Sequence, residues 1–297
     1  MSNRIIRDVE FDYVIVDEAA KATFPELAVS LNKAHKIILV GDHQQLPPVL
    51  DTEIIRNNKE KLDEEGLAQG VFERMYNMFP EDNKHRLTIQ YRMHPTIGTL
   101  ISHVFYNDEI QNGVEAQDRE LCIEGYEGIA IEWISTSKYS TKERYEKEFD
   151  NNGKKSYQNY LERNIIERKL LELDSKLVKR TKVAVITGYG SQKYILQTMV
   201  KQHSFKHIEV DVDTVDAFQG SQKDIILYST VRSSGNKYGI GFLKSEARIN
   251  VAFSRARCLL IIVGDMKFLD NYKIRGNKFP EIIKYITESE GCRIIEK

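Results

Sequence analysis

Short apolar runs rich in valine and isoleucine recur along the chain and alternate with amphipathic stretches. Each run has the length of one strand, and continuous apolar character is typical of parallel strands that are buried on both faces. The pattern predicts buried strands at residues 13–16, 36–40, 183–186, 225–228 and 259–263. Alternation of such strands with helices indicates an α/β fold whose parallel sheets are covered by helices.

Helical spacing of apolar residues predicts helices over residues 66–79 and 161–180, and both are expected to cover a sheet. Between Ser137 and Tyr160 the chain becomes rich in lysine, glutamate, tyrosine and asparagine, with little periodicity. That composition favours a mobile surface excursion, with a loop that touches nucleic acid as the alternative.

Several predicted strands end in a small or acidic residue. The pairs are Asp17-Glu18, Gly41-Asp42, Thr187-Gly188 and Gly264-Asp265. Open α/β sheets bind their ligands outside the carboxyl ends of the strands, so we expect the chemistry along that edge.

The bulk composition limits the classes of function. Across 297 residues, 43 lysines and arginines nearly balance 44 aspartates and glutamates, so any contact with nucleic acid must be local. Three widely spaced cysteines argue against a disulfide framework and against a zinc site. No apolar run approaches the length of a membrane span. We therefore expect a soluble protein of the cytoplasm, or of the nucleus in a eukaryote, with no membrane role.

Two adjacent carboxylates, Asp17 and Glu18, directly follow the first predicted strand. In nucleoside triphosphatases an acid at this position holds Mg²⁺, and a neighbouring acid can orient the attacking water. The alternative is a helix N-cap with a first-turn acid. Gln45 lies in a polar turn after the second strand, where an amide can sense a phosphate; a proline-stiffened loop is the alternative there.

Five segments, taken in order and spacing, resemble motifs of the superfamily 1 helicases. The closest branch is that of the up-frameshift helicase and senataxin, and the resemblance covers essentially the whole chain. The matching segments are residues 17–20, 41–48, 90–95, 215–220 with 223–227, and 248–257.

The resemblance implies a RecA-like fold in which ATP and Mg²⁺ bind between two domains, while single-stranded DNA or RNA crosses both. Residues 1–83 would be the back half of a first RecA-like domain, which is incomplete, and residues 84–297 would be a complete second one. The chain would be part of an ATP-dependent helicase or translocase. The alternative is a catalytically silent remnant that binds nucleic acid or a partner.

The resemblance also implies roles for single residues. Asp17 would hold the metal, Glu18 would activate water, and Gln45 would link the γ-phosphate to the nucleic-acid channel. Arg92 and Arg255 would act as arginine fingers. Further contacts are implied with ATP, by Tyr91, Gly220 and Gln222, and with the nucleic-acid strand, by Thr187, Tyr189 and Thr214.

Three points complete these expectations. Tyr91 would stack on adenine, although a core-facing tyrosine is an equal alternative. Gln222 and Gly188 depart from the family pattern, which has glutamate and proline there. No Gly-x-x-x-x-Gly-Lys-[Ser/Thr] loop occurs in the sequence. The expected partner is therefore an N-terminal helicase half that carries this loop, whether the chain is an experimental fragment, one subunit of a split motor or a decayed remnant.

Overall fold

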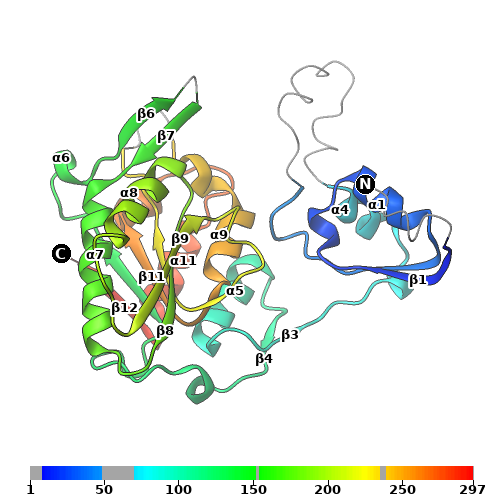
Figure 1. Ribbon diagram of the computed structural model, residues 1–297, viewed down its shortest axis with the longest axis horizontal. Helices are drawn as coiled ribbons and strands as arrows, with labels where there is room; N and C mark the ends of the chain where they lie inside the picture. The colour runs from blue at the N-terminus through cyan, green and yellow to red at the C-terminus, as the bar shows by residue number, and fades with distance from the viewer. Residues whose placement is uncertain (1–8, 49–69, 152–153, 235–238, 297) are drawn as a thin grey trace. The chain divides into compact units, whose positions relative to one another are not determined.

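A computed structural model describes residues 9–48, 70–151, 154–234 and 239–296. Contacts divide the chain into two compact units, residues 1–86 and residues 87–297 (Figure 1). No helix among the described residues is long and apolar enough to cross a membrane.

The first unit contains a two-stranded parallel sheet in which β1 pairs with β2 and Val16 lies opposite Leu39. Leu27, Phe72 and Ala19 form a small core, on which Val16 and Leu39 also pack. Its described elements are β1 (Phe11–Val16), η2 (Ala19–Lys21), α1 (Phe24–Leu31), β2 (Ala34–Leu39), α4 (Val71–Met78) and η3 (Glu81–Asn83). The predicted helix over 66–79 appears as α4, and residues 66–69 lie outside the described part of the chain.

The prediction that the first two strands are buried on both faces is wrong. Ile15 is 66% exposed and Tyr13 is 56% exposed, while Ile38 on β2 is also exposed. Paired strands present alternate side chains to opposite faces, and the core of this unit lies on one face only. Valine-rich composition alone could not distinguish a strand covered on one face from a strand covered on both.

The second unit is built on six parallel strands in the order β12-β5-β11-β10-β8-β9. This arrangement confirms the predicted α/β class with a parallel sheet and covering helices. The strands are β5 (Ile131–Ser135), β8 (Thr181–Thr187), β9 (Ile208–Thr214), β10 (Lys223–Ser229), β11 (Ala256–Gly264) and β12 (Cys292–Glu296).

Helices cover both faces of this sheet (Figure 1). Ile166 and Leu170 of α7 pack with Val185, Leu227 and Ile261 on one face. On the other face Trp133 meets Phe279 of α11 edge to face, and Tyr228 meets Phe253 of α9 in the same way. The helices are α5 (Pro95–Phe105), α7 (Tyr160–Lys176), α8 (Gly190–Val200), α9 (Glu246–Phe253), α10 (Met266–Asn271) and α11 (Phe279–Glu288).

The segment from Ser137 to Tyr160 is not an irregular excursion. It forms the short helix α6 (Thr141–Arg144) and an antiparallel hairpin of β6 (Lys147–Asn151) and β7 (Lys154–Gln158). Buried ion pairs fasten this segment to the sheet, because Arg144 contacts Asp265 and Glu146 contacts Arg232. Partners distant in sequence therefore order a stretch whose own composition suggested disorder. The remaining elements are β3 (Ile89–Gln90), β4 (Gln111–Asn112), η4 (Ala116–Arg119) and η5 (Gly241–Lys244).

Candidate functional site

Asp17 and Glu18 follow β1 directly, and both side chains are exposed. Glu18 adopts the left-handed conformation, with φ of 54° and ψ of 33°, which is uncommon for a residue other than glycine. One oxygen of Asp17 accepts a hydrogen bond from the Glu18 backbone N–H at 2.9 Å. Glu18 precedes a three-residue 3-10 turn and makes no side-chain cap there, so the N-cap alternative is not observed.

The end of β2 lies beside this pair of acids. Ala19 donates its backbone N–H to Val40 at 2.8 Å, and Val40 donates to Val16 at 2.8 Å. A Cβ added to Gly41 would lie 2.7 Å from the backbone nitrogen of Ala20, so a larger residue would push the two loops apart. Glycine at this position permits the close approach that brings the acids beside the second loop.

Gln45 is held by a residue that the motif comparison did not assign. Its amide nitrogen donates to Asp42 at 2.8 Å, and the backbone N–H of Gln44 donates to the other Asp42 oxygen at 3.0 Å. Asp42 therefore fixes the turn and orients the amide of Gln45. Contacts between an aspartate and the turn that follows it are common in loops, so the sequence did not single out Asp42 as the residue that orients Gln45.

The donor set suits a magnesium ion that is bound mainly by phosphate and water. Mg²⁺ usually takes one or two protein carboxylates and keeps several waters. Asp17 offers an exposed carboxylate of that kind. No group of three or more histidine, cysteine or acidic side chains that could hold a metal occurs among the described residues, so these side chains form no closed metal cage.

In the second unit the side chain of Gln90 stabilises the turn that carries Tyr91 and Arg92. Its amide oxygen accepts from the backbone N–H groups of Arg92 at 2.9 Å and Met93 at 2.8 Å. Its amide nitrogen donates to Asn112 at 2.8 Å. Tyr91 is 63% exposed, so the alternative of a core-facing tyrosine is wrong and the ring is available for stacking.

Arg119 and His94 fasten the same turn from outside. The Arg119 guanidinium donates to the Arg92 carbonyl at 2.9 Å and to the Tyr91 carbonyl at 2.7 Å. His94 donates its backbone N–H to Arg257 at 2.7 Å and accepts from Thr96 through Nδ1 at the start of α5. Burial lowers the pKa of His94, and the nearby Glu120 carboxylate opposes that shift.

Arg92 and Arg255 converge on one residue. Arg92 donates to the Ser254 carbonyl at 3.3 Å, and Arg255 donates to the Ser254 hydroxyl at 3.4 Å and to the Val251 carbonyl at 3.1 Å. Arg255 is only 3% exposed, whereas Arg92 is half-buried. The two arginines lie 163 positions apart in number yet meet because α5 packs on α9 and β11.

Two of the candidate nucleotide contacts, Gly220 and Gln222, lie in the segment that leads to Arg255. Gly220 and Gln222 precede β10, and the backbone N–H of Lys223 donates to the Arg255 carbonyl at 3.1 Å. Gly220 has φ of 81°, a conformation that favours glycine. All of these residues lie at the amino ends of β10 and β11. Their position differs from the carboxyl edge, where the strand-end pattern places the chemistry.

The three candidate contacts with the nucleic-acid strand do lie at the carboxyl edge of the sheet. Thr187 ends β8 opposite Thr214, which ends β9. Thr187 is fully buried and Tyr189 is 3% exposed, while Thr214 is half-buried. Thr187 and Tyr189 therefore present almost no side-chain surface for the direct contact that the resemblance implies, whereas Thr214 is partly accessible.

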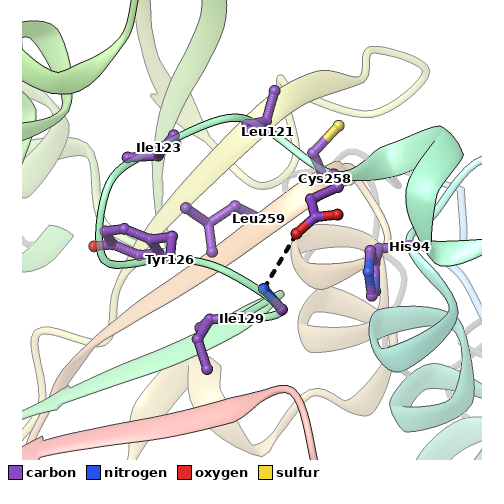
Figure 2. Close-up of a pocket in the computed structure, with 9 residues that line it drawn as sticks. His94, Leu121, Ile123, Tyr126, Ile129, Cys258 and Leu259 are labelled. Carbon is purple, nitrogen blue, oxygen red and sulfur yellow. Dashed lines mark hydrogen bonds between the residues drawn. The ribbon is translucent and has the colours of Figure 1, made fainter.

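A small pocket borders the Arg92 turn on the side of His94 (Figure 2). Glu120 closes it with a hydrogen bond from the Gly128 backbone N–H at 3.2 Å, and Cys258 lies at its rim. Its volume of about 10 Å³ suits roughly one water molecule. The pocket is too small for a nucleotide.

Two protein-family models, both described as an AAA domain, match residues 67–267 and residues 1–53. The chain is 36% identical over 273 residues to a regulator of nonsense transcripts 1 homolog from Neurospora crassa, which covers 90% of this chain and 24% of that protein. It is 36% identical over 292 residues to the ATP-dependent helicase NAM7 of Saccharomyces cerevisiae, covering 97% of this chain and 28% of that protein. The chain thus spans about a quarter of the length of these relatives.

Solved structures of helicases show a loose likeness in shape. The structure of the PRRSV helicase matches with a TM-score of 0.40 and 17% identity, over 84% of this chain and 34% of that one. The C-terminal domain of a possible DNA helicase from Lactobacillus plantarum matches with a TM-score of 0.35 and 11% identity, over 64% of this chain and 92% of that one.

Proposed function

This chain belongs to the superfamily 1 helicases related to regulator of nonsense transcripts 1, and we propose that it supplies the catalytic acids and arginine fingers of an ATP-driven motor. The motor would couple ATP hydrolysis to movement along single-stranded DNA or RNA. Residues 1–83 would act as part of the first RecA-like domain, and residues 84–297 would act as the second.

The observation that carries the proposal is the convergence of Arg92 and Arg255 on Ser254. Arg255 is only 3% exposed, and its guanidinium donates to the Val251 carbonyl and to the Ser254 hydroxyl, on the same residue whose carbonyl accepts from Arg92. Guanidinium groups that meet a developing charge on a transferred phosphoryl group accelerate such reactions by about a thousandfold or more. The proposal assigns that role to both arginines.

Each remaining residue has a task in the same reaction. Asp17 would hold Mg²⁺, which neutralises charge on the phosphates, while Glu18 would orient the attacking water. Gln45, oriented by Asp42, would report the state of the γ-phosphate. Tyr91 would stack on the base, and Gly220 and Gln222 would lie near the sugar. Thr214, which lies opposite the buried Thr187, would contact the nucleic-acid strand.

ATP also needs a glycine loop whose amides cradle its phosphates, and we propose that this loop lies outside these 297 residues. The test is steady-state ATP hydrolysis with Mg²⁺ and single-stranded DNA or RNA, with Glu18→Gln as the blank. Turnover should appear only when a segment bearing the glycine loop is added. Turnover by the chain alone that Glu18→Gln abolishes would contradict the assignment of the loop. Turnover in the complemented protein that survives Glu18→Gln would contradict the role of Glu18.

A further inference from the structure

The hairpin of β6 and β7 is anchored at its base by buried polar contacts. The Glu146 carboxylate accepts from the backbone N–H groups of Ser233 and Ser234, both at 2.9 Å, and pairs with the fully buried Arg232 at 3.1 Å. Asn159, at the end of the hairpin, donates to the Val231 carbonyl at 3.0 Å. These contacts join the hairpin to the residues that follow β10, at the carboxyl edge of the sheet.

One face of the hairpin is turned toward Tyr189, one of the candidate contacts with nucleic acid. The Arg232 guanidinium lies 4.1 Å from the centre of the Tyr157 ring, and Tyr157 meets Tyr189 edge to face at 5.2 Å. Glu148 accepts from the Tyr157 hydroxyl at 3.2 Å and from Lys155 at 2.8 Å. The acids of this face are therefore engaged with partners, and the face is continuous with Tyr189.

The opposite face carries exposed aromatic rings beside a lysine. In an extended strand alternate residues share a face, so Lys147 and Phe149 of β6 lie on the side away from Glu148, and Tyr145 precedes them at the same spacing in extended backbone. The Lys147 ammonium lies 5.3 Å from the centre of the Tyr160 ring, which places Tyr160 on this side too. Tyr145 is 38% exposed, Phe149 is 40% exposed and Tyr160 is 46% exposed.

We propose that this outer face, formed by Tyr145, Lys147, Phe149 and Tyr160, binds single-stranded nucleic acid. The inference rests on the proposed function and adds to it a second surface for the nucleic acid, separate from Thr187 and Thr214. Bases would stack on the three rings, and Lys147 would contact a phosphate. Exposed aromatic rings interleaved with basic groups bind single strands without reading sequence, because every base has a flat face.

The distribution of charge favours a nucleic acid as the occupant. The acids at alternate positions, Glu146 and Glu148, point to the inner face, where they pair with Arg232 and Lys155. On β6 the outer face therefore presents Lys147 and Phe149 and no carboxylate. On β7 the same face carries Ser156 and Gln158, whose side chains bond Ser191 at the start of α8. Its buried anchor also reduces the ordering cost that a flexible loop would face on binding.

The test measures the affinity of the whole chain for a fluorescent single strand by anisotropy, without nucleotide, over a range of salt concentrations. Tyr145→Ala and Phe149→Ala should each weaken binding by about fivefold or more. Tyr145→Phe should restore wild-type affinity, because the ring is kept. Lys147→Ala should reduce the slope of log affinity against log salt by about 0.7.

Two matched controls lie elsewhere in the same unit. Tyr194→Ala removes an exposed ring from the outer surface of α8, and Lys182→Ala removes an exposed lysine near the amino end of β8. Both should retain wild-type affinity. Wild-type affinity in the Tyr145 and Phe149 variants would overturn the proposal, as would equal losses in the controls. A change in oligomeric state with unchanged strand affinity would overturn it in favour of a second copy of the chain.

The two proposals fail separately. Loss of strand binding in the hairpin variants supports the outer face even where the complemented protein hydrolyses no ATP. If ATP turnover depends on Glu18 but the hairpin variants bind the nucleic acid with wild-type affinity, the proposed function stands. The outer face is then not part of the binding surface.

Discussion

Glu162 on α7 offers a prediction that depends on one buried carboxyl group. Its side chain is fully buried and accepts from the Ser229 hydroxyl at 2.6 Å, the Thr230 hydroxyl at 3.1 Å and the Val231 backbone N–H at 2.9 Å. Burial raises the pKa of Glu162 from its ordinary value of 4.5 to about 8, although these hydrogen bonds oppose the shift. We therefore expect a neutral carboxylic acid in the native protein at pH 7.

The sign of the pH dependence follows from this difference in pKa. Between pH 4.5 and about 8 the unfolded chain has lost the proton that the native protein still holds. The free energy of unfolding therefore falls as the pH rises through this window. The loss is about 1.4 kcal/mol per pH unit, or about 3 kcal/mol between pH 5 and pH 7.

Glu162→Gln removes the titration, so the variant should gain about 3 kcal/mol relative to the wild type over the same two pH units. The assay is urea unfolding at pH 5, 6 and 7, followed by the fluorescence of Trp133, the single tryptophan, which lies on β5 of the sheet that α7 covers. Glu288→Gln controls for the loss of an exposed glutamate. A constant difference between Glu162→Gln and the wild type would refute the reasoning, since it would mean that the three donors hold Glu162 ionised.

Three further predictions use other contacts. Glu132→Ala should lower the free energy of unfolding by about 3–5 kcal/mol in urea titrations, because it removes the buried carboxylate that Lys169 and Arg293 share. A loss under 1 kcal/mol would contradict the importance of that cluster. Gly41→Ala should cost about 1–3 kcal/mol in the same assay through overpacking, and an unchanged urea midpoint would contradict the close approach. Gln90→Ala should slow ATP turnover in the complemented protein about 100-fold by displacing the arginine turn, with Trp133 fluorescence unchanged; wild-type turnover would contradict that role.

The sequence predicted the strands that are apolar throughout and missed those that are not. The continuous runs of β8, β10 and β11 lie at the centre of the sheet and are buried on both faces. β5 was missed because it contains Glu132, whose burial depends on cations from α7 and β12. β9 was missed because it lies at the sheet edge and alternates apolar with acidic residues. The sequences of β5 and β9 do not indicate which distant residues and strands pack against them.

The motifs predicted the residues of the candidate site, but they did not predict which neighbours hold those residues in place. The order of the motifs predicted Arg92 and Arg255 together, and the structure brings both to Ser254. Gln90 and Arg119, which shape the Arg92 turn, act through backbone groups. Such contacts have no signature in spacing, because they depend on the path of the chain.

The measurement that tests the central claim most directly compares two neighbouring arginines in strand-stimulated ATP hydrolysis by the chain complemented with a glycine-loop segment. Arg257 pairs with Asp224 at 3.0 Å on the adjacent strand, so Arg257→Ala is the matched control for loss of a guanidinium. Arg255→Ala should lower the turnover rate by about a thousandfold or more. Arg257→Ala should change that rate by a few-fold at most, since it removes a partly exposed ion pair. Equal turnover by Arg255→Ala and the wild type would contradict the claim that this chain supplies the arginine fingers of a helicase motor.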